Sequence, residues 1–93
     1  MDEQRRAFAE YEIAEREYLE AIRDRADWPA LRSKAAEAAA KSRAWDVAAH
    51  AAWRKASGDG REALSLETDT SEVLAALWTD IALAYEGKPP LGD

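Results

Sequence analysis

The sequence predicts an all-α protein, a three-helix unit built on a long antiparallel helical hairpin. About a quarter of its 93 residues are Ala, the residue with the highest helix propensity. Small and apolar residues recur at spacings of three and four, which is the period of one helix face. Gly and Pro are few and fall at or beyond the ends of these periodic segments. We therefore expect one helical domain over residues 1–87 and a flexible tail over 88–93.

The first helix is expected over about residues 3–26. Its large apolar residues share one face, and a row of Ala at seven-residue intervals flanks them. The face comprises Phe8, Tyr11, Tyr18 and Ile22, and the row comprises Ala7, Ala14 and Ala21. Asp27 is placed to cap the next helix, and Pro29 is tolerated in a first turn. These two residues mark the corner of the hairpin.

The second helix, over about residues 28–57, carries the strongest pattern in the chain. Eight positions form an unbroken repeat of four- and three-residue steps: Leu31, Ala35, Ala38, Ser42, Trp45, Ala49, Ala52 and Ala56. One position in each heptad holds nothing larger than Ser, so another helix can approach this backbone closely. The repeat is a packing feature, and no pattern of similar strength indicates chemistry.

The third helix is expected to be shorter, over about residues 70–86, after a break at residues 58–60. Asp69 and Glu72 have the spacing of a capping box, and Gly87 with the two Pro residues beyond it ends the helix. The expected apolar face is Leu74, Leu77, Trp78, Ile81 and Tyr85. The conformation of residues 58–68 stays open, with its two Leu residues expected to cover the open end of the bundle.

Unequal helix lengths in this prediction favour self-association. At 1.5 Å per residue the third helix would be about 25 Å long and the second about 45 Å, so about half of the second would stay uncovered. Ile13, Val47 and Leu83 also lie away from the apolar faces of their helices. We therefore expect a homo-oligomer, most simply a two-fold dimer, or a protein partner.

Composition argues against several classes of function. A net charge of −6 disfavours direct contact with nucleic-acid phosphates. The absence of Cys excludes a disulfide framework, a thiolate zinc site and a Cys nucleophile. No apolar run reaches the length of a membrane span, and residues 1–6 lack the apolar region of a signal peptide. The expectation is a cytoplasmic protein with no cofactor, metal or catalytic residues, and with no membrane or nucleic-acid partner.

Charge alternates along the chain. Residues 1–27 hold nine acidic and five basic residues, residues 28–57 two acidic and six basic, and residues 58–93 eight acidic and two basic. An acidic row recurs every seven residues in the first helix: Glu3, Glu10, Glu17 and Asp24. A basic row recurs every eleven residues in the second: Arg32, Arg43 and Arg54. Both rows are candidate interaction surfaces, inside the molecule or toward a charged partner, and a solvated face explains the basic row equally simply.

Three more residues are interaction or site candidates. Glu15 lies within the apolar face of the first helix, where a carboxylate needs a partner. It is a candidate acid–base group or metal ligand, but we expect it to accept a hydrogen bond from a Tyr, Trp or Arg. His50 lacks a nearby carboxylate cluster in the sequence, so a surface or interface imidazole is expected rather than a metal ligand. Trp28, at the hairpin corner, is a candidate interface anchor.

Three functional hypotheses follow. The first is a small acidic helical protein–protein interaction module, a self-associating adaptor or regulator without enzymatic activity. The alternative is an acidic inhibitor of the antitoxin, immunity or phage-encoded type, which neutralises a basic nucleic-acid-binding protein. The third is a small oligomeric enzyme in which Glu15 acts as acid or base and an Arg of the second helix holds an anionic substrate.

Overall fold

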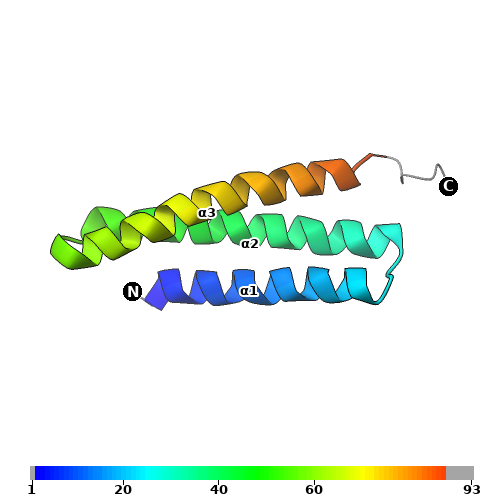
Figure 1. Cartoon of the computed structure of the whole chain (residues 1–93), viewed down its shortest axis with the longest axis horizontal. Helices are drawn as coiled ribbons and strands as arrows, with labels where there is room; N and C mark the ends of the chain where they lie inside the picture. Colours follow the sequence, from blue (N-terminus) through cyan, green and yellow to red (C-terminus); the bar gives the residue numbers. More distant parts are fainter. Residues whose placement is uncertain (1, 88–93) are drawn as a thin grey trace.

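The computed structural model describes residues 2–87 and confirms a three-helix unit (Figure 1). Its helices are α1 (Asp2–Arg23), α2 (Trp28–Lys55) and α3 (Gly58–Tyr85), and the described residues contain no strand. The unit is elongated, with extents of 54 × 19 × 15 Å. Both α1 and α3 run antiparallel to α2 and parallel to each other (Figure 1).

The corner between α1 and α2 is built by two local devices. Arg25 adopts a left-handed backbone with φ of 56°, and Ala26 and Arg25 donate main-chain hydrogen bonds to Ala21 and Ile22. This is the pattern of a Schellman motif, which ends a helix by satisfying its last carbonyl groups. Asp27 then accepts a hydrogen bond from the Ala30 main-chain N–H at 3.0 Å. The predicted cap at the start of α2 is therefore confirmed.

The small-residue seam of α2 forms the centre of the fold. Every position from Ala35 to Ala52 in the repeat is buried, while Leu31 and Ala56 at its ends are half-buried. Because Ala side chains end at Cβ, both α1 and α3 pack closely against this helix. Ser42 is fully buried in the seam, and its hydroxyl donates to the Ala39 carbonyl at 2.8 Å, so no polar group is left unpaired there.

The third helix is longer than the sequence predicted. It begins at Gly58 rather than near residue 70, so the expected break at 58–60 is wrong: these residues belong to α3, and the connection between the two helices is residues 56–57. Gly58, directly after this connection, has a positive φ of 61°, which Gly tolerates. Asp69 and Glu72 lie inside the helix, so the predicted capping box is wrong. Residues 58–68 are helical and do not form a separate cover over the bundle end.

A repeat that continues from Leu64 explains why α3 extends so far. Its steps of four and three residues match those of the α2 seam, and every member is buried or half-buried. The members are Leu64, Thr68, Ser71, Ala75, Trp78, Ala82 and Tyr85. Since α3 and α2 each contain 28 residues, the predicted length mismatch between them is wrong. Helix length therefore no longer argues for a dimer.

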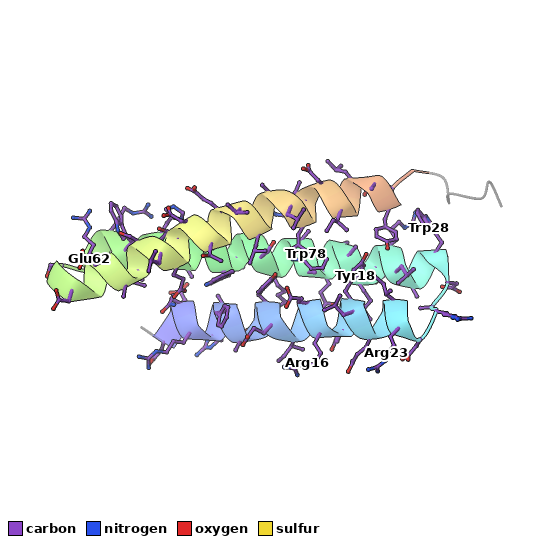
Figure 2. All side chains as sticks on the ribbon, viewed as in Figure 1. Arg16, Tyr18, Arg23, Trp28, Glu62 and Trp78 are labelled. Carbon is purple, nitrogen blue, oxygen red and sulfur yellow. The ribbon has the colours of Figure 1, made fainter. Side chains whose placement is uncertain are left out.

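Helices α1 and α3 meet only through long side chains. No Cα atom of α1 lies within 8 Å of a Cα atom of α3 over the described residues. Large aromatic residues span this distance: Tyr18 packs edge-on against Trp78 with ring centroids 5.1 Å apart, and edge-on against Tyr85 at 6.0 Å. Figure 2 shows Tyr18 and Trp78 directed into the space between the helices. These side chains fill much of the space between α1 and α3, and beside Phe8 and Leu66 they leave an open groove.

Within residues 2–87, none of the helices combines the length and apolarity needed to cross a bilayer. The tail predicted over residues 88–93 lies outside the described residues.

Candidate protein-interaction surface

Glu15 accepts a hydrogen bond at the end of a short relay that begins at Trp78. The indole N–H of Trp78 donates to the Tyr11 hydroxyl at 2.8 Å, and that hydroxyl donates to Glu15 Oε2 at 2.7 Å. Burial, followed by the hydrogen bond to Glu15, raises the pKa of Tyr11 to about 12. Tyr11 therefore stays a proton donor near neutral pH. Glu15 occupies the hydrogen-bonding role that we expected from the sequence.

Trp28 and Tyr85 pack together at the end of the molecule near the hairpin corner. The hydroxyl groups of Tyr18 and Tyr85 lie 2.7 Å apart, and burial of Tyr18 raises its pKa. Trp28 packs on the Tyr85 ring with centroids 4.7 Å apart, and its side chain is half-buried. The candidate anchor therefore contacts α3 of its own chain, which leaves less of the indole free for a partner.

Glu67 joins all three helices at the opposite end. Its Oε2 atom accepts hydrogen bonds from Trp45 Nε1 at 2.8 Å and from the side-chain amide of Gln4. Phe8 packs on Trp45 with ring centroids 4.8 Å apart. The sequence prediction missed Glu67 because residues 58–68 were not assigned to a helix, and the continued repeat from Leu64 was the signal that would have placed it.

Two members of the acidic row on α1 pair with α2. Glu10 lies 2.8 Å from Lys41, and Glu17 lies 3.1 Å from Lys34. The first pair lowers the pKa of Glu10 and raises that of Lys41. The acidic row therefore faces lysines rather than the basic row. Of the other two members, Glu3 is exposed in the first turn and Asp24 lies 3.5 Å from Arg23.

The basic row stays at the surface of α2. Arg43 donates to the Thr79 hydroxyl of α3 at 3.3 Å. Arg32 and Arg54 are exposed, and Arg54 lines a small pocket with Val47 and His50. The structure brings none of these three Arg side chains into an ion pair, among the residues that it describes, with the acidic row of α1.

His50 has carboxylate neighbours that the sequence did not reveal. Its Nδ1 atom lies 2.9 Å from the Asp46 carbonyl and 3.2 Å from the Asp46 carboxylate, while Nε2 lies 3.2 Å from Glu72 of α3. The hydrogen bond to the Asp46 main chain is the main cause of a raised His50 pKa, the two carboxylates add to it, and burial opposes it. The expectation that His50 lacks nearby carboxylates was therefore wrong.

We call the group of His50, Asp46, Ser71 and Glu72 the clamp, because its contacts connect α2 to α3. Its geometry is not that of a catalytic triad. Fully buried Ser71 donates to the Asp46 carboxylate at 2.6 Å, so its hydroxyl faces the acid and not the imidazole. Residues 2–87 contain no group of three or more His, Cys, Asp or Glu side chains arranged to hold a metal ion. The cluster joins α2 to α3 through charge and hydrogen bonds.

An exposed apolar stripe runs along the groove side of α3. Leu66, Val73 and Leu77 are 73%, 67% and 50% exposed, and with Thr70 they follow steps of four, three and four residues. This stripe is separate from the repeat that packs on α2. Leu77 was predicted in the packed face, and that assignment was wrong because α3 turns its Trp78 and Leu74 side toward α1 instead.

Apolar groups of α1 and α2 continue the same surface. Leu19 and Ile22 of α1 are exposed, although Ile22 was predicted to belong to the packed face. An open pocket of about 320 Å³ lies between the three helices, and its lining is Phe8, Trp45, Leu66, Glu67 and Thr70. We call this surface the α1–α3 groove. Ile13, Val47 and Leu83 are exposed elsewhere, as the helical periodicity predicted.

Comparison with known protein families, curated proteins and solved structures finds no match for this chain.

Proposed function

We propose that this chain is a helical protein-interaction module, without enzymatic activity, that docks a helix of a partner in the α1–α3 groove. The observation that carries the proposal is the apolar stripe of Leu66, Val73 and Leu77 beside an aromatic pocket. A contiguous exposed apolar surface of this kind is typical of interaction sites. An amphipathic partner helix contacts such a groove through apolar residues at the same three- and four-residue steps.

Burial energies support a docking role for the stripe. Full burial of one exposed Leu or Val side chain contributes about 1.5–3 kcal/mol, so covering the 50–73% of these three side chains that is exposed favours association. Glu67 and Thr70 place polar atoms at the edge of the pocket. Polar atoms beside an apolar centre fix the orientation of a docked helix.

The other hypotheses have less support. Glu10 and Glu17 are paired with lysines, so two of the four carboxylates in the acidic row are already engaged within the molecule. For the enzyme hypothesis, Glu15 is engaged by Tyr11, whereas Arg43 contacts Thr79. Thr79 lies about 100° around α3 from Trp78, which donates to Tyr11, so this Arg and Glu15 approach different faces of α3.

Site-specific photo-crosslinking in the cells from which the protein comes tests the proposal. A photoreactive residue replaces Leu66 or Leu77 in the groove, and Val47 on α2 serves as a matched control because it is 68% exposed outside the groove. We expect adducts with a helical protein chain at positions 66 and 77 and few at 47. Equal or lower yields at the two groove positions would contradict the proposal.

A further inference from the structure

We propose that the occupant of the α1–α3 groove is a second copy of this chain, related by a two-fold axis parallel to the helices. Each α1 then lies over α3 of the partner subunit. This inference rests on the proposed function, because it assumes that the groove is a docking surface. It adds the identity of the partner and the direction of the symmetry axis.

The first argument is that the two sides of the groove carry opposite charge. On a wheel of 100° per residue, Arg5, Arg16 and Arg23 fall within about 60° of Leu19 on α1, with the exposed Glu12 and the half-buried Glu15 also in this range. We call these three arginines the basic flank. Figure 2 shows Arg16 and Arg23 projecting from α1 on the side away from α2.

The corresponding side of α3 is acidic. Its four carboxylates fall within about 60° of the exposed Leu66, and all are exposed: Asp59, Glu62, Asp69 and Asp80. We call these residues the acidic flank. The basic residue that α3 contains, Arg61, lies over the Trp53 ring at 3.9 Å and so belongs to another face. The groove therefore has an apolar floor between a basic and an acidic side.

The second argument is that the flanks match in spacing and level. Arg5 and Arg16 are eleven residues apart, as are Asp69 and Asp80, which corresponds to about 16 Å along a helix. Three contacts between α1 and α3 set the relative level of the two helices. They join residues separated by 63, 67 and 67 positions: Gln4 with Glu67, Tyr11 with Trp78, and Tyr18 with Tyr85.

Arg5 and Asp69 differ by 64 positions, and so do Arg16 and Asp80, so each Arg lies within about 4.5 Å of the level of its Asp along the molecule. A two-fold axis parallel to the helices exchanges α1 and α3 of the two copies without changing this level. Arg5 then meets the partner subunit's Asp69, and Arg16 meets the partner subunit's Asp80. An axis perpendicular to the helices would instead place α1 on α1, with Arg against Arg.

The third argument is area. With α1 about 33 Å long and two helices about 20 Å wide, the face covers roughly 650 Å² on each copy, or about 1,300 Å² in total. Specific stable interfaces bury about 1,200–2,000 Å², so the whole face is large enough for a dimer. A single docked helix would cover the groove but leave both charged flanks open. A second copy covers the groove and pairs Arg5 and Arg16 of the basic flank with Asp69 and Asp80 of the acidic flank.

Charge reversal tests the inference, with the dimer measured by analytical ultracentrifugation. The first variant carries Arg5→Asp and Arg16→Asp, the second Asp69→Arg and Asp80→Arg, and the third all four changes. We expect the dimer dissociation constant to rise on the order of 10- to 100-fold in each of the first two variants. We expect the four-residue variant to regain the dimer, because its flanks are again opposite in sign.

The matched control is Arg32→Asp with Arg54→Asp, the same charge change on exposed positions outside the groove. We expect it to dimerise like the unaltered chain, and circular dichroism confirms that every variant is folded. A monomeric unaltered chain, or a dimer unaffected by either two-residue reversal, would overturn the inference. Failure to regain the dimer in the folded four-residue variant would overturn the axis direction.

The two proposals fail in different ways. Crosslinks at positions 66 and 77 to a different chain, together with a monomeric protein, overturn the second copy but support the groove as a docking site. Absence of crosslinks at these positions overturns the groove itself, whatever the oligomeric state.

Discussion

The indole N–H of Trp78 donates a hydrogen bond to the hydroxyl of Tyr11 at 2.8 Å, although no Cα atoms of their helices come within 8 Å of each other. Tyr11 in turn donates to Glu15. Both rings are almost fully buried. This relay fixes the distance and rotation of α1 relative to α3, and it therefore sets the width of the groove between them.

Replacing the central group of this relay is expected to be costly. Tyr11→Phe leaves the Trp78 N–H and one Glu15 oxygen without their partner, so we expect a loss of about 1–3 kcal/mol in the free energy of unfolding. Urea denaturation measures it. Tyr18→Phe is the matched control, since it removes one hydroxyl pair at about 0.5–1.5 kcal/mol. A Tyr11 variant as stable as the control contradicts the relay.

The α2 seam is expected to reject larger side chains. Ala49 is fully buried, so Ala49→Leu forces α1 or α3 outward and costs about 1–3 kcal/mol of stability. The control is Ala40→Leu on the exposed face of α2, for which a change within about 0.5 kcal/mol is expected. Thermal or urea unfolding of the two variants gives the comparison, and equal stabilities would show that the seam is not tightly packed.

Two Gly residues at the start of α3 are expected to respond in opposite directions. Gly58 has a positive φ, so Gly58→Ala is expected to destabilise the fold by about 1 kcal/mol. Gly60 lies in the helix, and no neighbouring atom lies within 4 Å of the place that an added Cβ would occupy. Gly60→Ala is therefore expected to stabilise the fold by about 0.5–1 kcal/mol. Denaturant midpoints measure both changes. A destabilising Gly60→Ala would mean that α3 starts later in the chain.

The clamp at His50 is expected to make stability depend on pH. Its pKa is raised above the ordinary value of 6.5 by the Asp46 main chain and by the carboxylates of Asp46 and Glu72. Arg54, which lines the same pocket, is the nearby positive group. A raised pKa means that the contribution is fully present below about pH 6.5 and is lost as the pH rises through the folded value.

Comparison of the unaltered chain with His50→Gln from pH 6 to pH 8.5 isolates this contribution. We expect the difference in unfolding free energy to be larger at pH 6 than at pH 8.5. Glu72→Gln, which keeps the shape but removes one carboxylate, is expected to reduce the slope. A difference that stays constant across this range would show that the pKa of His50 is the same in the folded and the unfolded chain.

Local periodicity was sufficient for much of the fold. The spacing of small residues along α2 predicts its buried face, and Asp27 with Pro29 predicts where the helix begins. These features depend on interactions within a few residues, or on which face is apolar. Such properties are present in the order of the side chains alone.

The start of α3 required the tertiary structure. Gly58 and Gly60 lower helix propensity, and this local signal suggested a break that extended to residue 69. Packing of Leu64, Thr68 and Ser71 in the continued repeat outweighs it. Propensity is worth about 1 kcal/mol at a Gly, whereas the burial of several side chains along a 28-residue helix is worth more.

The candidate surface also depended on tertiary structure. Two apolar stripes run along α3, and the sequence by itself does not decide which packs inward, because both have helical spacing. Contacts such as Trp78 with Tyr11, and His50 with Glu72, join residues 67 and 22 positions apart. The rotation and level of the packed helices bring these pairs together. The sequence determined that the chain forms three helices and where the α2 seam lies, whereas packing between helices decided where α3 begins and which side chains stayed exposed in the groove.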